Sequence, residues 1–408
     1  MNRGNIKLNN PERFMGEYKI PEEKIQRAIS NATKKLAIYA DRYKDGFPVP
    51  VEFGKKDITE YALGPNDNWV HGMHTGTYLL SYELTGDKKF LDVAEHHIPT
   101  YQDFIDNKVT KLRDHDVGFI FSPSVIAYYK LTGNKMAYSM ALAAAEHQFT
   151  YGYSQRGGFI LRVADCHGWP AFCRTMVDTM LNIPLLYWGW QETGHRGYLN
   201  AANSQLAITE EYLIRPDAST CHHYQFEIGS HKPLHEVTWQ GNSNESTWSR
   251  GHSWVVYGIP LALSYNAGHH YIDFEHYMNV HRDITYYALN HYPEDNVPYW
   301  DYDFISGDEP RDTSAAVINI CGMLEAVRYL PDDRPEKEIY KNAAAKSLEA
   351  VIDMYTSDDP YKFAGLLSGV TPAKPSLGFG YDTCALYGDY YYLEALMRYV
   401  NPSWKKYW

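Results

Sequence analysis

YELTGDKKFLDVAEHH, at residues 82–97, contains the turn on which the fold of this chain depends. An apolar helix leads up to Gly86, and a glycine can take the left-handed backbone conformation that closes a helix. A few polar residues follow, and an amphipathic helix then begins. The stretch therefore predicts a pair of helices joined by a short turn.

The same pattern recurs four more times along the chain. Each copy turns at a glycine or, in the last, at a proline, which blocks continuation of a helix. The copies are YYKLTGNKMAYSMALAAAEHQ (128–148, Gly133), WQETGHRGYLNAANSQLA (190–207, Gly194), LSYNAGHHYIDFEHYM (263–278, Gly268) and AVRYLPDDRPEKEIYKNAAAKSL (326–348, Pro331). Their irregular spacing favours helical hairpins joined by long loops over a solenoid of identical repeats.

The pattern predicts twelve helices that alternate in character. Those before each turn are rich in Trp, Tyr, Leu and small residues, which indicates burial, and those after it are more polar. Six buried helices inside six amphipathic ones form an all-α, single (α/α)6 toroid. The expected ranges are 22–44, 68–86, 88–106, 117–132, 134–150, 173–193, 196–213, 247–267, 270–291, 311–330, 335–356 and 382–400.

The composition narrows the classes of partner and compartment. The 408 residues carry a formal net charge of −12 with no basic stripe, which argues against nucleic acid as a partner. The 36 Tyr and 10 Trp are typical of sugar-binding clefts and equally of large helical cores. Five cysteines without a CxxC spacing predict reduced thiols. With no apolar signal segment and no run long enough to span a bilayer, we expect a cytoplasmic protein without a membrane partner.

Polar and aromatic residues gather where the expected inner helices begin. In a toroid of hairpins all inner helices run the same way, so their N-termini meet at one mouth, and helix N-termini favour anions. The residues at these starts are Trp69, His115, Asp116, Asp178, Trp248, Arg250, Trp254, Arg311, Asp312 and Tyr381. Arg311 and Asp312 read as a structural charge pair at a helix start.

The two carboxylates Asp116 and Asp178 stand out at this mouth. Asp116 sits where an N-cap would, whereas Asp178 lies a turn inside the expected helix 173–193, where capping does not explain it. Apolar neighbours should raise the pKa of Asp178 and keep its proton available. Such a pair is the template for glycoside cleavage by a general acid and base. No HExxH motif is present, so no metal site is expected. GxSxG and a phosphate-binding glycine loop are absent as well, which gives no support to a serine nucleophile or a phosphate site.

Eight stretches between about residues 67 and 398 resemble glycoside hydrolase family 88, the unsaturated glucuronyl hydrolases. Among the most specific are DHDVGFIFSPS, RTMVDTMLNIPLLYW, WSRGHSWVVYG and LYGDYYYLEALMR. The resemblance implies a catalytic (α/α)6 domain at 22–408 behind an N-terminal extension at 1–21. It also implies a partner, an oligosaccharide that a polysaccharide lyase has left with a C4=C5 double bond in its terminal uronate. The family hydrates this vinyl ether instead of attacking the anomeric carbon, and it needs no cofactor.

The resemblance also implies roles for particular residues. Asp178 matches the acid/base and Asp116 the second essential carboxylate. Trp69 is expected to stack on the substrate. The residues expected to hold the uronate and its hydroxyls are His115, His222, Gln240, Arg250 and Trp254, with Tyr381 as a weaker candidate. Lys374 lies in the loop 365–380, where a lysine can meet a sulfate on the substrate.

Three other functions remain open at the level of sequence. A pectin-type unsaturated rhamnogalacturonyl hydrolase would share the toroid. A catalytically silent glycan-binding toroid would be expected to lack Asp116 or Asp178, and both are present. A polysaccharide lyase would use a Tyr/His base and would create double bonds instead of consuming them. The sequence indicates no oligomeric state.

Overall fold

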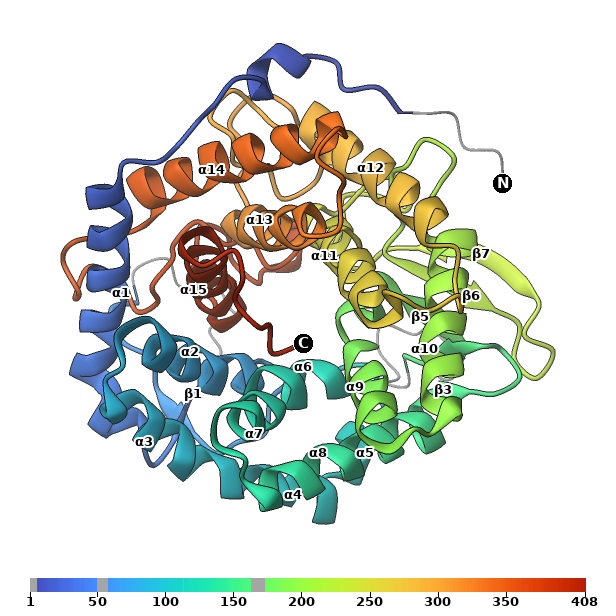
Figure 1. Ribbon diagram of the computed structural model, residues 1–408, viewed down its shortest axis with the longest axis horizontal. Coiled ribbons are helices and arrows are strands. Elements are labelled where there is room, and N and C mark those ends of the chain that lie inside the picture. The colour runs from blue at the N-terminus through green and yellow to red at the C-terminus, as the bar shows by residue number, and fades with distance from the viewer. Residues whose placement is uncertain (1–5, 50–57, 113, 163–172) are drawn as a thin grey trace.

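The computed structural model describes residues 6–49, 58–112, 114–162 and 173–408. Two concentric rings of helices make up the molecule (Figure 1). The inner ring consists of α2 (Val70–Thr85), α6 (Val117–Phe121) with α7 (Ala127–Thr132), α9 (Pro184–Thr193), α11 (Ser249–Asn266), α13 (Thr313–Val327) and α15 (Leu386–Val400). The outer ring consists of α1 (Glu22–Tyr43), α3 (Lys88–His97), α8 (Lys135–His147), α10 (Arg196–Ile208), α12 (Phe274–Asn290) and α14 (Pro335–Tyr355).

The rings close because α15 packs against both α13 and α2, so the last inner helix meets the first. This arrangement confirms the predicted (α/α)6 toroid. Two short helices, α4 (Gln102–Asp106) and α5 (Val109–Leu112), lie between α3 and α6 in the chain. Single π-type turns at 122–126, 148–152 and 209–213 interrupt or end α6–α7, α8 and α10.

The predicted glycine turns are present. Gly86, Gly133 and Gly194 have φ of 72°, 70° and 72° and close α2, α7 and α9 in the left-handed conformation. The Gly86 N–H donates to the carbonyl of Tyr82 at 2.7 Å. The next helix begins at once, since the side chain of Asp87 accepts a hydrogen bond from the Lys89 N–H. These local signals explain why the hairpins could be recognised from sequence.

The prediction of one helix over 173–193 is wrong. Residues Arg174–Met176 form the strand β5, and a 3₁₀ turn over Val177–Leu181 precedes α9. Pro184 opens α9 because a proline has no N–H to continue a helix from the residues before it. β5 instead pairs antiparallel with β6 (His223–Phe226), which pairs with β7 (Pro233–Val237).

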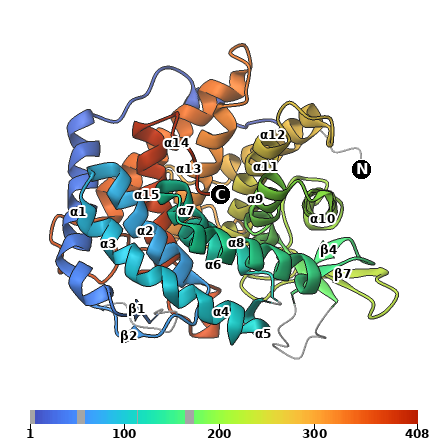
Figure 2. The ribbon, with the colours of Figure 1, turned by 60° about the horizontal axis from the view of Figure 1, so that its bottom comes forward.

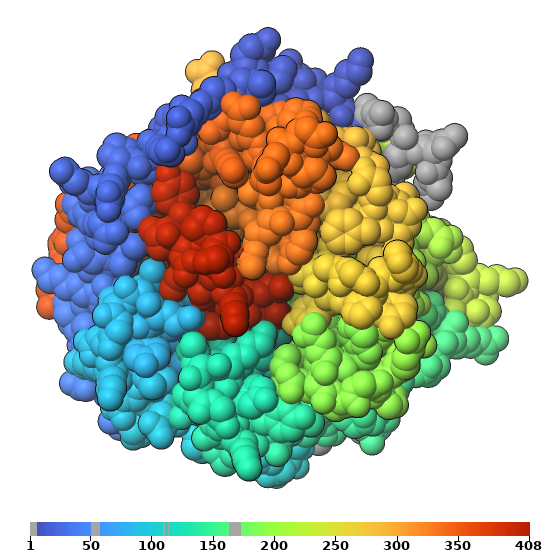
Figure 3. Space-filling view, in the orientation of Figure 1, coloured from blue at the N-terminus to red at the C-terminus, as the bar shows by residue number. Residues whose placement is uncertain are grey.

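The remaining strands form two small hairpins. They are β1 (Phe47–Pro48) with β2 (Leu63–Gly64), and β3 (Tyr153–Ser154) with β4 (Phe159–Ile160). Figure 2 shows β1, β2, β4 and β7 at one end of the helical ring. On the face seen in Figure 3 the middle of the ring is filled, with residues from the C-terminal part of the chain at its centre. The buried Trp404, Tyr407 and Trp408 belong to this part.

Residues 6–21 run along the outside of the ring, as Figure 1 shows. Their 3₁₀ helix η1 (Pro11–Phe14) buries Phe14, and Arg13 donates to the carbonyl of Tyr292 at 2.9 Å. Cys173, Cys221, Cys321 and Cys384 are free thiols, and Cys166 lies outside the described residues. No helix in the described part of the chain has both the length and the hydropathy needed to cross a membrane.

The inner helices approach each other at glycines. A Cβ added at Gly118 would lie 2.4 Å from the Cα of Asn182, and one at Gly258 would lie 2.5 Å from the Cβ of Met180. Real Cβ atoms do not come this close to rigid backbone. Both contacts place the 177–182 turn, which carries Asp178, between α6 and α11.

We expect Gly118→Ala to destabilise the fold by about 1–3 kcal/mol, because the helix must move away from the turn to admit a methyl group. Thermal unfolding followed by circular dichroism would measure this. Gly133→Asn is the matched control, since nothing lies within 4 Å of a Cβ at that site and asparagine tolerates the left-handed conformation. Equal melting temperatures for the two variants would contradict the packing argument.

Candidate active site

One cavity of about 350 Å³ opens where the inner helices begin. Trp69 and Trp248 occupy the N-cap positions of α2 and α11, Asp116 that of α6, and Tyr387 lies in the first turn of α15. The residues that line it are Trp69, Asp114, His115, Asp116, Arg162, Met176, Asp178, His223, Trp239, Gln240, Trp248, Arg250, Trp254, Pro372, Ala373, Phe379 and Tyr387. The mouth expected from the common direction of the inner helices is therefore present.

Asp178 is buried in the 3₁₀ turn before α9, with 8% of its surface exposed. Its Oδ2 has no hydrogen-bond partner among the described residues. Asp178 is one of the residues that line the cavity. Burial raises the pKa of Asp178 to about 6, opposed by His115 and reinforced by the negative charge of Asp116. The side chain is therefore a carboxylic acid up to a pH of about 6, in the wall of the cavity.

Asn182 fixes this turn against the neighbouring inner helix. Its side-chain carbonyl accepts a hydrogen bond from the Phe119 N–H at 2.8 Å, and its amide donates to the carbonyl of Asp178 at 2.9 Å. Phe119 is three residues from Asp116, so one side chain sets the relative position of the two acids. The N–H of Val177 donates to the carbonyl of His222 at 3.1 Å, which ties the turn to β6 as well.

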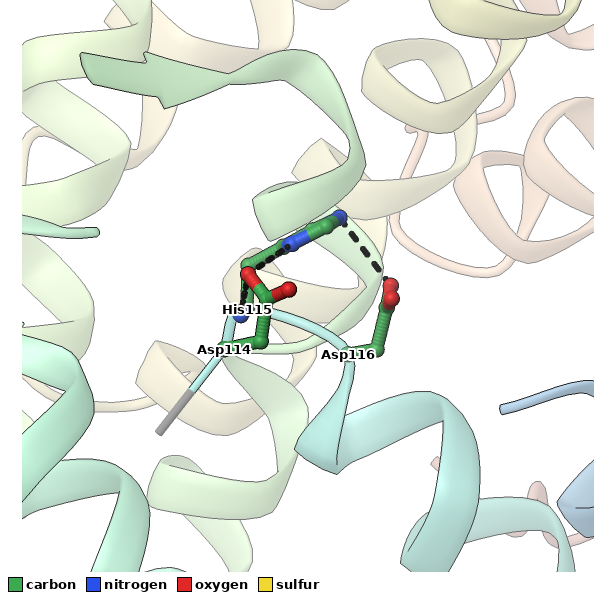
Figure 4. Close-up of side chains that lie close together, drawn as sticks. All are labelled: Asp114, His115 and Asp116. Carbon is green, nitrogen blue, oxygen red and sulfur yellow. Dashed lines mark hydrogen bonds and ion pairs between the residues drawn. The ribbon is translucent and has the colours of Figure 1, made fainter. Parts of the chain in front are cut away.

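Asp116 does not cap its helix. No side-chain capping bond is present at the start of α6, and the carboxylate instead faces the ring of His115, with Oδ1 and Nε2 3.0 Å apart. On the other side of the ring, Asp114 Oδ1 lies 2.9 Å from Nδ1 (Figure 4). The capping interpretation of Asp116 is therefore wrong, because this carboxylate forms an ion pair at the cavity wall.

Arg250 supplies a buried positive charge to the same cavity. Its Nη1 lies 3.1 Å from Asp312 Oδ2 and also donates to the carbonyl of Thr371, and its Nη2 donates to the carbonyl of Pro372. The guanidinium carbon lies 4.6 Å from the ring centroids of both Trp248 and Tyr387. Asp312 caps α13 and orients Arg250, so its role is structural as predicted. The predicted pairing of Arg311 with Asp312 is wrong, because Arg311 pairs with Asp295 at 2.7 Å instead.

Aromatic rings complete the walls of the cavity. The indole N–H groups of Trp248 and Trp254 are buried and have no acceptor among the described residues. Trp69 stacks on Tyr387 with centroids 5.6 Å apart, and Trp239 meets Phe379 edge-on at 5.0 Å. Such a set of flat apolar faces and unsatisfied donors suits a sugar, which presents C–H faces and hydroxyl edges.

The structure brings most of the predicted site residues to this cavity. Trp69, His115, Asp116, Asp178, Gln240, Arg250 and Trp254 line it. His222, Tyr381 and Lys374 are not among the lining residues. Gln240 donates from its side chain to the carbonyl of Pro372 at 2.8 Å, so it also holds the loop 365–380 in place.

His222 lies directly behind the lining residues. Its Nδ1 accepts the backbone N–H groups of Trp239 and Gln240 at 3.3 and 3.4 Å, and Nε2 has no partner among the described residues. Burial, with the charge of Arg250, holds the pKa of His222 well below its usual range. The neutral ring therefore carries its proton on Nε2.

Several lining residues were missed in the sequence. They are Asp114, Arg162, Met176, His223, Trp239, Pro372, Ala373, Phe379 and Tyr387. Asp114 and Trp239 stand next to the predicted residues His115 and Gln240 in the chain, and this adjacency was a weak indication that they belong to the site. Arg162 follows β4 and reaches the cavity only because the β3–β4 hairpin lies beside β5, a contact that no local pattern announces.

Asp114, His115 and Asp116 form the one group in the described chain with metal-ligand potential, since their donor atoms lie within 4.8 Å of one another. Both ring nitrogens of His115 already face carboxylate oxygens. A metal would need a ring lone pair and a displaced hydrogen bond. The geometry fits a charged hydrogen-bonded chain better than a ligand set.

Taken together, the cavity holds a neutral acid, a paired carboxylate, a buried guanidinium and aromatic faces. The acid can deliver a proton to a bound molecule, and the paired carboxylate can stabilise positive charge that develops near it. Arg250 can bind an anionic group. This set is suited to acid-catalysed chemistry on an anionic sugar.

Comparison with known proteins points the same way. Residues 51–399 match the family described as Glycosyl Hydrolase Family 88. The chain is 36% identical over 405 residues to the unsaturated chondroitin disaccharide hydrolase of Streptococcus pneumoniae, with 98% of each chain covered. A crystal structure of unsaturated glucuronyl hydrolase from Streptococcus agalactiae superposes with a TM-score of 0.90 at 33% identity, covering 100% of both chains. A mutant of that enzyme complexed with dGlcA-GalNAc6S superposes with a TM-score of 0.84 at 31% identity, again over 100% of both chains.

The burial of Asp178 predicts a pH-dependent cost in stability. Because the folded pKa of about 6 lies above the ordinary aspartate value of 3.8, the folded state is favoured while the acid keeps its proton. That contribution is lost as the pH rises through 6, at a cost of roughly 2–3 kcal/mol. We expect Asp178→Asn to melt higher than the wild type at pH 8 and at about the same temperature at pH 4.

Asp116→Asn is the control for this measurement. It also removes one carboxylate from the cavity, but that carboxylate is paired with His115, so its loss should bring no comparable gain at pH 8. If Asp178→Asn gave the same shift in melting temperature at both pH values, the raised pKa of Asp178 would be wrong.

Proposed function

Because this chain belongs to glycoside hydrolase family 88 and is therefore a glycosidase, we propose that it releases the terminal 4,5-unsaturated uronate from lyase-generated oligosaccharides. The observation that carries the proposal is Asp178, a buried acid with a raised pKa that lines the cavity beside the pair of His115 and Asp116, and whose Oδ2 has no partner among the described residues. A glycosaminoglycan disaccharide is the substrate class that the relatives' activities favour.

The proposed reaction is hydration of the C4=C5 vinyl ether. The Asp178 carboxyl transfers its proton to C4, and the electron pair of the double bond forms the new C–H bond. Positive charge then develops at C5 and the ring oxygen, where the Asp116 carboxylate stabilises it. A water adds to C5 and returns its proton to the Asp178 carboxylate. The resulting hemiketal opens, and the glycosidic link breaks without attack on the anomeric carbon.

Arg250 is proposed to recognise the uronate carboxylate. The chain carries a net charge of −12, so its overall field repels an anionic substrate and the site needs a local cation. Asp312 and the carbonyls of Thr371 and Pro372 hold Arg250 in one orientation before substrate binds. Trp69 and Trp254 are proposed to contact the sugar faces, and the Nε2–H of His222, just behind them, to support a hydroxyl.

The finer assignments follow from the same chemistry. We propose that Tyr381, of which 39% is exposed, and Lys374 act only at the outer sugar, since neither lines the cavity. The free thiols Cys173, Cys221, Cys321 and Cys384 fit a cytoplasmic enzyme acting on imported disaccharides. We propose residues 22–408 as the catalytic domain, with residues 1–21 as an N-terminal extension, of which residues 6–21 run along the outside of the ring.

The function is tested by following the ultraviolet absorbance of unsaturated chondroitin and hyaluronan disaccharides. We expect the absorbance to fall with the wild type, and Asp178→Asn to reduce kcat by at least about a thousandfold, since the other acids in the cavity, Asp114 and Asp116, are both paired with His115. Asp301→Asn is a matched control, because Asp301 is also buried but is hydrogen-bonded outside the cavity. Loss of absorbance only with unsaturated galacturonyl-rhamnose would favour the pectin-type reaction, and a rise on intact polymer would show a lyase.

The raised pKa of Asp178 also predicts the pH profile. The acid is active while protonated, so kcat/KM should fall as the pH rises through about 6, the pKa of Asp178. A steady-state profile between pH 4 and 9 measures this directly. A profile that still rises between pH 6 and 8 would show that Asp178 is not the proton donor in the free enzyme.

A further inference from the structure

We propose that Asp114, held by Arg162, is a positioning residue that keeps a positive charge on His115 and so holds Asp116 ionised beside the proton donor. The inference rests on the proposed function for its catalytic consequence. Its structural part concerns a side chain behind the reacting groups, since Asp114 contacts His115 and Arg162 and acts on Asp116 only through the imidazole.

The four side chains form a chain of alternating charge. The Arg162 guanidinium pairs with Asp114 Oδ2, and Asp114 Oδ1 lies 2.9 Å from His115 Nδ1. The backbone N–H of His115 also donates to Asp114 Oδ1 at 2.9 Å, which holds that carboxylate against the backbone beside the ring. Nε2 of the same ring lies 3.0 Å from Asp116 Oδ1, and Figure 4 shows the ring between the two acids.

This geometry requires protons on both ring nitrogens. A carboxylate only accepts hydrogen bonds when ionised, and a neutral imidazole has one N–H and one lone pair. With a carboxylate at each end, either neutral tautomer of His115 would direct a lone pair at a negative oxygen. The doubly protonated ring satisfies both partners, and such charge-assisted bonds are about twice as strong as neutral ones.

The charges around the ring favour the same state. Burial of His115, of which 3% is exposed, opposes a charge. The carboxylates of Asp116 and Asp178 outweigh this and raise the pKa of His115, while Arg174 on β5 lowers it. In addition to burial, Arg250, Arg162 and Arg174 lower the pKa of the neighbouring His222, so several cations lie near this part of the cavity. Asp114 is an acid in direct contact with the His115 ring there.

A positive charge on His115 affects Asp116 and Asp178 in different ways. The positive His115 stabilises the negative charge of Asp116 and lowers the pKa of Asp178, which burial has raised. His115 therefore pairs with Asp116, while Asp178, the neighbouring acid, keeps its proton up to a pH of about 6. Without Asp114, the ring needs only one proton, and at neutral pH Asp116 would face an uncharged partner.

The test compares Asp114→Asn with wild type by two independent readouts. The first is the pKa of His115, from NMR of protein labelled with ¹³C-histidine, with the resonance assigned through His115→Gln. We expect the pKa of His115 to fall by about one unit or more in Asp114→Asn, because one of two neighbouring negative charges is lost. This readout needs no substrate, so it stands even if the proposed function fails.

The second readout is kcat/KM for unsaturated chondroitin disaccharide as a function of pH. We expect Asp114→Asn to match the wild type at pH 5, where the ring is still charged, and to fall about tenfold behind at pH 8, the difference between a charge-assisted and a neutral hydrogen bond. The loss should appear in kcat more than in KM. A structural role alone would give the same fractional loss at every pH.

Two further variants keep the test sharp if Asp114→Asn folds poorly. Asp114→Glu retains the negative charge and should restore a pH-independent ratio to the wild type. Arg162→Gln breaks the same ion pair but leaves the carboxylate beside His115, so the ring should keep its proton. The proposal is overturned if the pKa of His115 is the same in wild type and Asp114→Asn, or if Arg162→Gln lowers it as much as Asp114→Asn. A wild type inactive on every unsaturated disaccharide would instead refute the proposed function.

Discussion

The close approach of the inner helices at glycines is the constraint on which the site depends. Gly118 admits the backbone of Asn182, and Gly258 admits that of Met180, so the 177–182 turn fits between α6 and α11. A larger residue at either position would push the turn outward. Asp178 sits on this turn, and its distance from Asp116 is therefore set by backbone contacts that cannot be compressed. Within that space, Asn182 fixes the turn through its hydrogen bonds with Phe119 and Asp178.

The direction of the helices adds the second condition. Since the inner helices all begin at one end, their first turns bring together side chains that are far apart in the chain. Arg250 on α11, Asp312 before α13 and Tyr387 on α15 meet in this way. Each closes one side of the guanidinium, and the loop carbonyls of Thr371 and Pro372 close another. Together with the hydrogen bond from Gln240 to Pro372, these contacts hold the loop as a wall of the cavity.

Much of this architecture is visible in the sequence because its signals are local. A glycine at Gly86 or Gly133 closes a helix with its own residues, and the alternation of apolar and amphipathic helices follows from which side each ring buries. The gathering of Asp116, Asp178 and Arg250 follows from helix direction alone. The 173–193 segment defeats the same reasoning. Its apolar run reads as helix, but the partner that makes Arg174–Met176 a strand lies some fifty residues away on β6.

Arg162 and Phe379 could not be predicted as site residues from the sequence, for a related reason. They enter the cavity from hairpins and loops whose positions depend on long-range pairing, and no periodicity marks them. Asp114 stands beside a predicted histidine, yet its role depends on which nitrogen of that ring it faces. Adjacency in the chain says nothing about this, because neighbouring side chains can point to opposite sides.

Burial alone does not identify the catalytic acid among the acids of this chain. Asp301 and Asp389 are also buried, and burial raises their pKa values to about 6 and about 7. The two oxygens of Asp301 accept from Asn242, Ser246 and Asp303, and Asp389 accepts the N–H groups of Leu366 and Leu367.

Asp178 differs in what its oxygens meet. Its Oδ2 is the one buried carboxylate oxygen of the described chain with no hydrogen-bond partner, and Asp178 lines the cavity. An unsatisfied buried acceptor is costly in a folded protein and gains a partner when a polar ligand binds. The distinction between a structural acid and a working one therefore lies in the hydrogen bonds that the fold leaves unmade. The same criterion sets the indole N–H groups of Trp248 and Trp254 apart from that of Trp404, which has found Glu83.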